Sequence, residues 1–400
     1  MFQTRWLLHL SIFCACCAVI VSSPTESLSA TEPGIAQLAH AHPSTLWDVQ
    51  EVVALKKSVK TNPGLRTAFD ALQTWGNTRL SQPLGVPTHR LLPDGSWTFP
   101  EYKPGYKDTS GQWQWQWDFN TRLQQCSDDV SKLGMLYALT GNPKYADFAG
   151  QILLALTDAY GYDKGSSVPD PNGYDHFQAY GFDGGDDGLF LAKACNGYDL
   201  ICNSLSSENR FSIESGLIRP LAVHLEANDW MYTNQSRWAL VCLYGVLIGG
   251  TTLNDRDMED LALYGKGGTK DNVTGGFMDC FKQSPPHPGS LWPADTKIED
   301  QMASVCVMTS VAEVMRHNGV DLYEYQDRAL KLSFDAALAW ANSNGASNLL
   351  ALRGIDAFQY AYVRYHDAKY LEVVNQLKPS FALTLGEQLP PLPTLAEKGG

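Results

Sequence analysis

The chain has 400 residues, of which 44% are hydrophobic and 11% aromatic. This composition supports a large folded core and excludes an intrinsically disordered protein. The formal net charge of −13 argues against nucleic acid as a partner, because a phosphate backbone requires a positively charged face. An acidic ligand is compatible with this charge only where it meets locally basic groups.

Residues 1–30 have the pattern of a secretory signal peptide. Arg5 precedes an apolar run from Trp6 to Val21, and small residues follow up to Ala30. The run is shorter than the roughly 20 residues that a membrane-spanning helix needs. We therefore expect residues 1–30 to be removed, and residues 31–400 to be a secreted, monomeric single domain with no membrane attachment.

The expected export determines the chemistry we predict for the cysteines and for the N-glycosylation sequons. Three of the nine cysteines lie in the signal segment, and the other six would enter an oxidising compartment, where disulfides are expected although their pairing stays open. No CxxC spacing or cluster of histidines predicts a structural metal, and no cofactor is expected. Sequons at Asn234 and Asn272 predict glycosylation if they are exposed. The six cysteines are Cys126, Cys195, Cys202, Cys242, Cys280 and Cys306.

Helical periodicity dominates the chain. The clearest example is Asn142-Pro143-Lys144, an N-cap with proline at the first helical position, followed by apolar residues at helical spacing up to Leu156. Alternating strand patterns are scarce, so we predict an all-α fold of antiparallel helical hairpins. Further helices are predicted over 48–60, 64–80, 121–140, 187–204, 207–227, 236–249, 299–317, 321–343 and 354–376.

Three long irregular stretches separate these helices: 81–119, 160–186 and 265–298. Loops of this length in a compact domain are commonly functional. The first contains many aromatic residues, which either stack on the faces of sugar rings or cover helix ends. These aromatics are Trp97, Tyr102, Tyr106, Trp113, Trp115 and Trp117.

The segment from Asn234 to Trp238 places amide, guanidinium and indole groups at the start of an apolar helix. A helix N-terminus presents free N–H groups and a partial positive charge, which suit a carboxylate. The segment therefore predicts an acidic-sugar site. Simple capping of the helix is the alternative role of Asn234.

Several short motifs follow one another along the chain: His42–Leu46, Asn120–Gln125, Ala138–Ala146, Asn234–Trp238, Glu299–Gln301, Ala312-Glu313 and Asn318–Tyr323. In this order they resemble the alginate-lyase-like superfamily of polysaccharide lyases over residues 42–365. The resemblance implies an incomplete (α/α) toroid of helical hairpins, a cleft lined by long loops, and β-elimination of an acidic polysaccharide such as alginate or glucuronan.

By this resemblance, Asn234 neutralises the uronate carboxylate, while Gln235 stands where many relatives carry histidine. The loop residues Tyr174, His176 and Tyr180 offer a proton acceptor and donor. Arginine and amide side chains suit carboxylate and hydroxyl recognition. The predicted substrate-binding residues are Asn120, Arg122, Gln124, Gln125, Gln235, Arg237, Trp238, Trp292, Glu299, Arg353 and Tyr360.

One departure from the family pattern concerns the catalytic tyrosine that several relatives carry near the helix start at residue 300. The sequence there reads Lys297-Ile298-Glu299-Asp300-Gln301, without a tyrosine. The acid and base must then come from elsewhere, and Tyr264, Tyr360 and Tyr365 are further candidates. Arg364 and Tyr365, together with Arg353 and Tyr360, resemble one segment of the family near the C-terminus.

Two other functions fit the sequence. An (α/α)-barrel glycoside hydrolase would use two carboxylates about 5 to 9.5 Å apart, drawn from Asp186, Asp187, Glu299 and Asp300. A non-catalytic carbohydrate-binding protein would keep the aromatic loops without the missing tyrosine.

Overall fold

The computed structural model describes residues 42–87, 90–91, 97–98, 114–163, 184–227, 229–233, 237–282, 298–344 and 355–377. The expected signal peptide, residues 1–30, lies outside these ranges. Within them, no helix combines the length and apolar character needed to cross a membrane.

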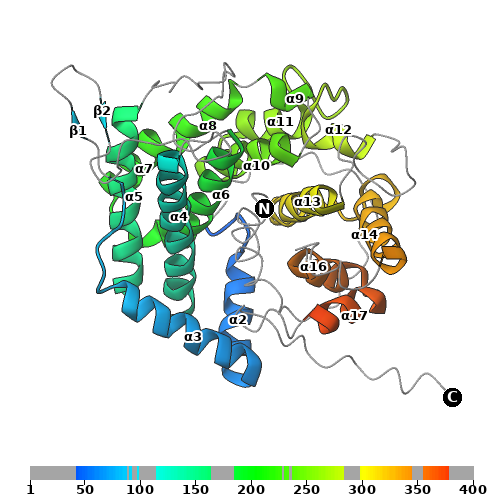
Figure 1. The fold of residues 1–400 in the computed structure, drawn as a ribbon, viewed down its shortest axis with the longest axis horizontal. Coiled ribbons are helices and arrows are strands. Elements are labelled where there is room, and N and C mark those ends of the chain that lie inside the picture. The colour runs from blue at the N-terminus through cyan, green and yellow to red at the C-terminus, as the bar shows by residue number, and fades with distance from the viewer. Residues whose placement is uncertain are drawn as a thin grey trace.

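Pairs of consecutive helices form a ring, with the first helix of each pair on the inside and the second on the outside (Figure 1). This arrangement confirms the predicted all-α toroid of helical hairpins. The inner helices are α2 (Val49–Thr61), α4 (Gln114–Thr140), α6 (Gly184–Ile201), α10 (Arg237–Leu253), α13 (Ile298–His317) and α16 (Ile355–Tyr365). The outer helices are α3 (Pro63–Arg79), α5 (Pro143–Asp163), α8 (Arg219–Glu226), α11 (Arg256–Tyr264), α14 (Tyr325–Asn344) and α17 (Ala368–Leu377).

Shorter elements complete the described chain. They are the hairpin strands β1 (Arg90–Leu91) and β2 (Trp97–Thr98), the 3-10 turn η3 (Cys202–Ser204), α7 (Ser207–Ile213), the π-helical turn η4 (Glu214–Ile218), α9 (Trp230–Thr233) and α12 (Gly276–Lys282). The two strands pair antiparallel, with Arg90 opposite Thr98.

Three long helices predicted from periodicity are interrupted. The helix expected over 207–227 contains the π-turn η4. The one expected over 321–343 has left-handed backbone at Gln326, Asp327 and Arg328, and the one expected over 354–376 is broken at His366, whose φ of 52° is left-handed. The spacing of apolar residues does not reveal where a few residues inside a helix depart from the α-helical backbone. The helix α11 was not predicted, although Asp255 caps it by accepting a hydrogen bond from the Met258 N–H at 3.3 Å.

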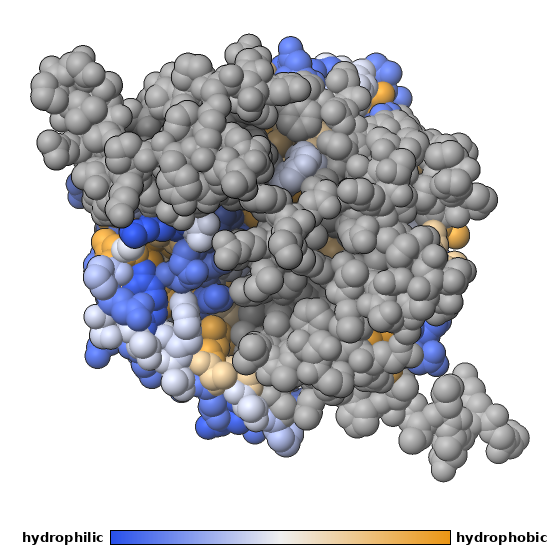
Figure 2. Space-filling view, in the orientation of Figure 1, coloured by the Kyte–Doolittle hydropathy of each residue, from blue (hydrophilic) through white to orange (hydrophobic). Residues whose placement is uncertain are grey.

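The surface of the described residues on the side of α3 and α5 is mainly hydrophilic, with small separate apolar spots (Figure 2). This pattern fits the position of α3 and α5 on the outside of the ring (Figure 1). Their apolar faces are turned inward: Leu65, Tyr145, Ile152 and Leu156 are all at most 1% exposed.

The expected disulfides are absent from the described residues, where all six cysteines are free thiols, and this expectation was wrong. Five of the six are buried in the helical core, where a thiol packs as a small apolar group. Burial also makes several of them poor nucleophiles, because it raises the pKa of Cys126 to about 12 and raises the pKa of Cys195 and Cys280.

The inner helices α4, α6 and α10 pack backbone against backbone at glycines. A Cβ added to Gly188 of α6 would lie 2.4 Å from the Val241 carbonyl oxygen of α10. A Cβ added to Gly197 of α6 would lie 2.6 Å from the Val130 carbonyl oxygen of α4. No larger side chain fits at either contact without moving a helix.

We predict that Gly188→Ala lowers the free energy of unfolding by about 2 kcal/mol, because the added methyl group meets rigid backbone. Gly150→Ala in α5 is the control, since its Cβ would meet only the flexible end of Leu205 at 2.9 Å. In that helix interior, alanine is favoured over glycine by up to about 1 kcal/mol. Urea unfolding followed by circular dichroism measures both variants, and equal stability of the two would contradict the proposed packing constraint.

Residues 42–48, here called the lead segment, cross one end of the ring. The Asp199 carboxylate, in the last turns of α6, accepts hydrogen bonds from the backbone N–H groups of Ser44 and Thr45, each at 2.8 Å, and pairs with His42. At the end of α13, His317 Nδ1 donates to the Thr45 carbonyl at 2.5 Å. The lead segment therefore fastens the C-terminal ends of α6 and α13 to the same end of the ring.

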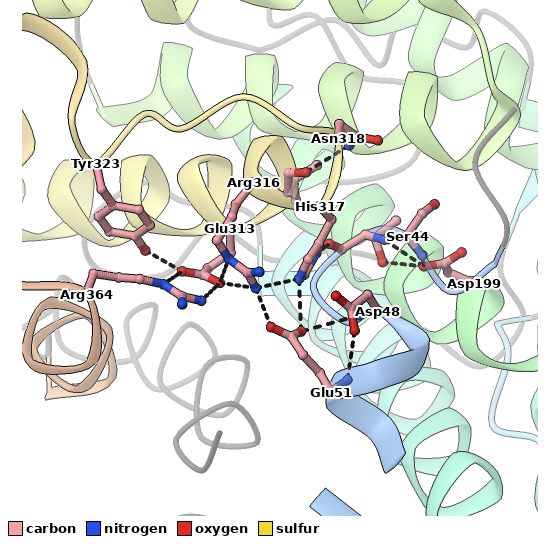
Figure 3. Close-up of polar contacts among 12 residues, drawn as sticks. Ser44, Asp48, Glu51, Asp199, Glu313, Arg316, His317, Asn318, Tyr323 and Arg364 are labelled. Atoms are coloured by element: carbon pink, nitrogen blue, oxygen red, sulfur yellow. Dashed lines mark hydrogen bonds and ion pairs between the residues drawn. The ribbon is translucent and has the colours of Figure 1, made fainter. Parts of the chain in front are cut away.

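A network of buried charges continues from the lead segment to α16 (Figure 3). Arg316 of α13 pairs with Glu51 of α2 and, at 2.9 Å, with Glu313. Glu313 also pairs with Arg364 of α16 at 2.6 Å and accepts a hydrogen bond from the Tyr323 hydroxyl at 2.6 Å. Burial would raise the pKa of Glu313, but the charges and hydrogen bonds of Arg364 and Arg316 outweigh it and lower the pKa to about 2.

We predict that Glu313→Gln destabilises the fold by about 3 kcal/mol, because it leaves two partly buried arginines without their shared anion. The pKa of Glu313 is lowered in the folded state, so its contribution is complete above its ordinary value of 4.5 and is lost as the pH falls toward 2. Unfolding measured at several pH values should show the variant and the unmodified protein converging below pH 4.5.

The control is Glu324→Gln, which removes a 2.7 Å pair with Arg328 in which both side chains are 51% exposed. Exposed pairs of this kind contribute little, so its stability should stay almost unchanged. A Glu313→Gln protein as stable as this control would show that the buried network does not hold the ring together.

Candidate functional site

Four inner helices begin at the end of the ring opposite the lead segment. Gln124 in the first half of α4 donates to the Asp186 carbonyl at the start of α6 at 2.9 Å, and Gly188 places the start of α6 against the start of α10. The helix α13 ends at the lead segment, so it too begins at the opposite end. The N-termini of these four helices therefore lie on one side of the molecule, where their partial positive charges favour an anionic ligand. At α6, the buried first-turn carboxylates of Asp186 and Asp187 offset part of that charge.

The segments that precede α6, α10 and α13 contain Tyr174, His176, Tyr180, Asn234, Gln235 and Trp292 of the predicted site, although those segments are far apart in the sequence. Many of these residues lie outside the described structure, so only their neighbours can be placed. Thr233, at the end of α9, and Arg237, at the start of α10, bound the segment that contains Asn234. The predicted residues outside the described ranges are Asn234, Gln235, Tyr174, His176, Tyr180, Trp292 and Arg353.

Other predicted residues have described positions at this end. Arg122 and Gln125 are exposed on α4, and Gln125 donates to Asp129 of the same helix at 2.7 Å. Trp238 is half-buried in the first turn of α10. Asn120, Arg237 and Glu299 lie in described helices, but their side chains are outside the described structure.

Gln124 was predicted to bind substrate, and the structure corrects this. It is 2% exposed, and its amide joins the start of α6 to the buried Lys193, whose ammonium lies 3.4 Å from Gln124 Oε1. A side chain enclosed in this way is not accessible to a sugar. Gln124 instead fixes the position of α6 relative to α4.

The tyrosines suggested near the C-terminus are also in the interior. Tyr360 is 5% exposed, which argues against direct contact with a polysaccharide. Tyr365 donates to the Tyr323 carbonyl at 3.1 Å, and burial raises its pKa. Arg364 belongs to the buried network near the lead segment, at the other end of the ring. Tyr264, at the end of α11, is half-buried, and burial raises its pKa.

A buried ion pair below the helix starts was not predicted from the sequence. Lys193 of α6 is fully buried and pairs with Asp128 of α4 at 2.7 Å. Burial lowers the pKa of Lys193, although the charge of Asp128 opposes the shift. A lysine within the apolar run from Leu189 to Ala194 was the available signal in the sequence, since a buried lysine requires a partner.

Two of the four carboxylates proposed for a hydrolase, Asp186 and Asp187, do not meet its requirement, while the side chains of Glu299 and Asp300 lie outside the described structure. Asp186 and Asp187 are both 0% exposed in the first turn of α6. A general acid and its partner must both reach the glycosidic bond. Their burial at a helix N-terminus fits a structural role, because acidic residues stabilise the first turn.

Asp48, Glu51 and His317 are the described side chains whose ligand atoms lie close enough together to hold a metal ion, within 4.8 Å of one another. The guanidinium of Arg316 already pairs with Glu51, and its Nη2 lies 2.7 Å from His317 Nε2. A positive charge therefore occupies the place that a cation would need. Asp48, Glu51 and His317 therefore belong with the network of buried charges that continues from the lead segment to α16.

Comparison with known proteins supports the relationship suggested by the motifs. No family model matches the chain. It is 33% identical over 146 residues to an alginate lyase of Stenotrophomonas maltophilia, a match that covers 36% of this chain and 18% of that protein. It is 24% identical over 244 residues to an exo-oligoalginate lyase of Saccharophagus degradans, which covers 59% of this chain and 30% of that protein. The chain thus spans less than a third of the length of either relative.

The fold is similar to the crystal structure of an alginate lyase from Bacteroides ovatus, with a TM-score of 0.58 at 13% identity, over 87% of this chain and 100% of that one. The protein is therefore a helical toroid of the alginate-lyase type. Together with the two sequence matches, this fold confirms the resemblance to the alginate-lyase-like superfamily of polysaccharide lyases.

Proposed function

We propose that this protein is a polysaccharide lyase that cleaves alginate by β-elimination. The observation that carries the proposal is the convergence of four helix N-termini, from segments distant in sequence, at one end of the ring. A polyanionic chain needs such a local positive potential on a protein whose net charge is −13. The two sequence relatives are both lyases of alginate or its oligomers, which supports the choice of substrate.

In the proposed reaction, Asn234 donates hydrogen bonds to the uronate carboxylate and so stabilises the negative charge that develops there when C5 loses its proton. A base takes that proton, the electron pair forms a C4–C5 double bond, and the C4–O bond breaks. An acid then protonates the leaving oxygen. Tyr174, His176 and Tyr180, on the segment that leads into α6, are our candidates for the base and acid.

Substrate binding is proposed for residues at the same end. Arg122 and Gln125, exposed on α4, are suited to hydrogen bonds with carboxylate and hydroxyl groups, and Trp238 is suited to stacking on a sugar ring. Asn120, Gln235, Arg237, Trp292, Glu299 and Arg353 complete the proposed set. We further propose that the protein acts outside the cell, as a monomer.

Incubation with alginate, polyglucuronate and a neutral glycan tests the activity. Elimination creates a double bond conjugated to the carboxylate, so we expect ultraviolet absorbance to grow with alginate and to stay flat with the neutral glycan. New reducing ends without that absorbance would identify a glycoside hydrolase instead. Binding without either product would identify a non-catalytic carbohydrate-binding protein.

We predict that Asn234→Ala lowers kcat by about 100-fold or more while the protein stays folded, because loss of one preorganised donor to a developing charge typically costs this much. Asn272→Ala is the matched control: it removes the other sequon, whose asparagine is exposed in a turn after α11, and should leave kcat unchanged. Mass spectrometry should find no glycan on Asn234, since a glycosylated amide is not available to a substrate. Near-normal turnover of Asn234→Ala would remove Asn234 from the mechanism.

A further inference from the structure

Residues 265–275, here called the α11–α12 loop, lie at the same end of the ring as the proposed substrate site. The helix α11 runs antiparallel to α10, because its first turn packs near the last turn of α10: a Cβ added to Gly250 would lie 2.9 Å from the Met258 Cβ. The loop that follows α11 therefore returns to the end at which α10 begins. It is the first part of the irregular stretch 265–298 predicted from the sequence.

The α11–α12 loop packs directly against the residues that precede Asn234, and α12 contacts both α9 and α11 (Figure 1). A Cβ added to Gly275 would lie 2.5 Å from the Tyr232 carbonyl oxygen, so the loop backbone touches α9 two residues before Asn234. At the beginning of the loop, the Lys266 ammonium lies 5.4 Å from the centre of the Tyr232 ring and pairs with Asp229. The loop thus brings a cation to the segment for which we propose uronate binding.

Internal hydrogen bonds fix the shape of the α11–α12 loop. The Tyr264 carbonyl accepts from the Thr274 N–H at 2.9 Å, and the Thr274 hydroxyl donates to the Lys266 carbonyl at 2.9 Å. Thr269 and Asn272 exchange backbone hydrogen bonds of 2.9 and 3.1 Å. A loop joined across its ends in this way is ordered before a ligand arrives, so binding costs little further conformational entropy.

The Lys266 ammonium is accessible to a ligand. The side chain of Lys266 is 47% exposed, and that of its partner Asp229 is 84% exposed. An ion pair with this exposure contributes little stability, so a carboxylate of the polysaccharide can share or replace Asp229 at small cost. The face of the Tyr232 ring attracts a cation and so limits the positions that the ammonium takes.

We propose that Lys266 determines specificity for acidic polysaccharides by binding the carboxylate of a uronate next to the sugar that Asn234 contacts. Each sugar of a polyuronate carries a carboxylate, so a chain held at Asn234 presents further carboxylates to the neighbouring elements. This role rests on the proposed function, to which it adds a second carboxylate site on a separate element. Because the ammonium does not touch the reacting sugar, it contributes to affinity and not to the chemical step.

Steady-state kinetics on alginate oligomers test the role of Lys266. We expect Lys266→Met to raise KM about fivefold or more, because a hydrogen bond to a charged group is lost, and to change kcat by less than about twofold. Lys270→Met is the matched control: it removes the same charge from the same loop, where Lys270 is exposed between Thr269 and Asn272, and should change KM by less than about twofold. Equal effects of the two variants would show a general charge effect and overturn the proposal.

Further variants separate binding from folding. Lys266→Arg keeps the charge and should keep KM near that of the unmodified protein. The KM difference caused by Lys266→Met should shrink at about 0.5 M salt, because ions screen exposed charges, whereas a structural defect would persist. Asp229→Asn removes the competing carboxylate and should lower KM, while Asp271→Asn, the same charge change on the loop, should not. If Lys266→Met does not fold, equal KM values of these two aspartate variants would overturn the proposal.

Calorimetric binding of an alginate tetramer distinguishes a failure of this role from a failure of the proposed function. In the Asn234→Ala background, where we expect slow cleavage, Lys266→Met should weaken the Kd by the same factor of about five. An unchanged Kd would overturn the role of Lys266 and leave the lyase activity standing. Binding by the unmodified protein without cleavage would overturn the lyase activity, while the Kd comparison still decides for Lys266. An unmodified protein that neither binds nor cleaves alginate and polyglucuronate would overturn both.

Discussion

At Gly188 the backbone of α6 lies so close to α10 that an added Cβ would sit 2.4 Å from a carbonyl oxygen, and at Gly197 the same helix meets α4 in the same way. These contacts let the backbones of three long helices approach one another closely while the helices run parallel. The glycines therefore fix both the direction of α4, α6 and α10 and how far each helix extends along the ring.

The parallel inner helices α4, α6, α10 and α13 give the ring two chemically different ends. At one end, the lead segment and the charges around Glu313 and Arg316 join α2, α6, α13 and α16. At the other, four helix N-termini come together. Peptide dipoles add where helices start side by side, so the second end is suited to an anionic polysaccharide even though the whole protein is acidic.

The buried polar groups at the two ends of the ring have different roles. Lys193, Asp128 and Gln124 lie beneath the helix starts and are satisfied by one another, so they hold the scaffold of the proposed site without offering groups to a ligand. The burial of Asp186 and Asp187 makes two of the four carboxylates considered for a hydrolase inaccessible to a glycosidic bond. His42 and Asp199 lie at the opposite end, where they hold the lead segment against α6.

The sequence by itself determined the helical class and the order of the hairpins. Helical periodicity and caps such as Asn142-Pro143 are local properties, readable from neighbouring residues. Tertiary structure decided which polar residues are accessible: Gln124 and Gln125 are adjacent and chemically identical, yet one is 2% exposed and the other faces solvent. It also decided that six cysteines pack as free thiols, and that His42 pairs with Asp199. Those outcomes depend on contacts between residues distant in the sequence, such as Gln124 and Asp186, which are 62 positions apart, and no local pattern specifies them.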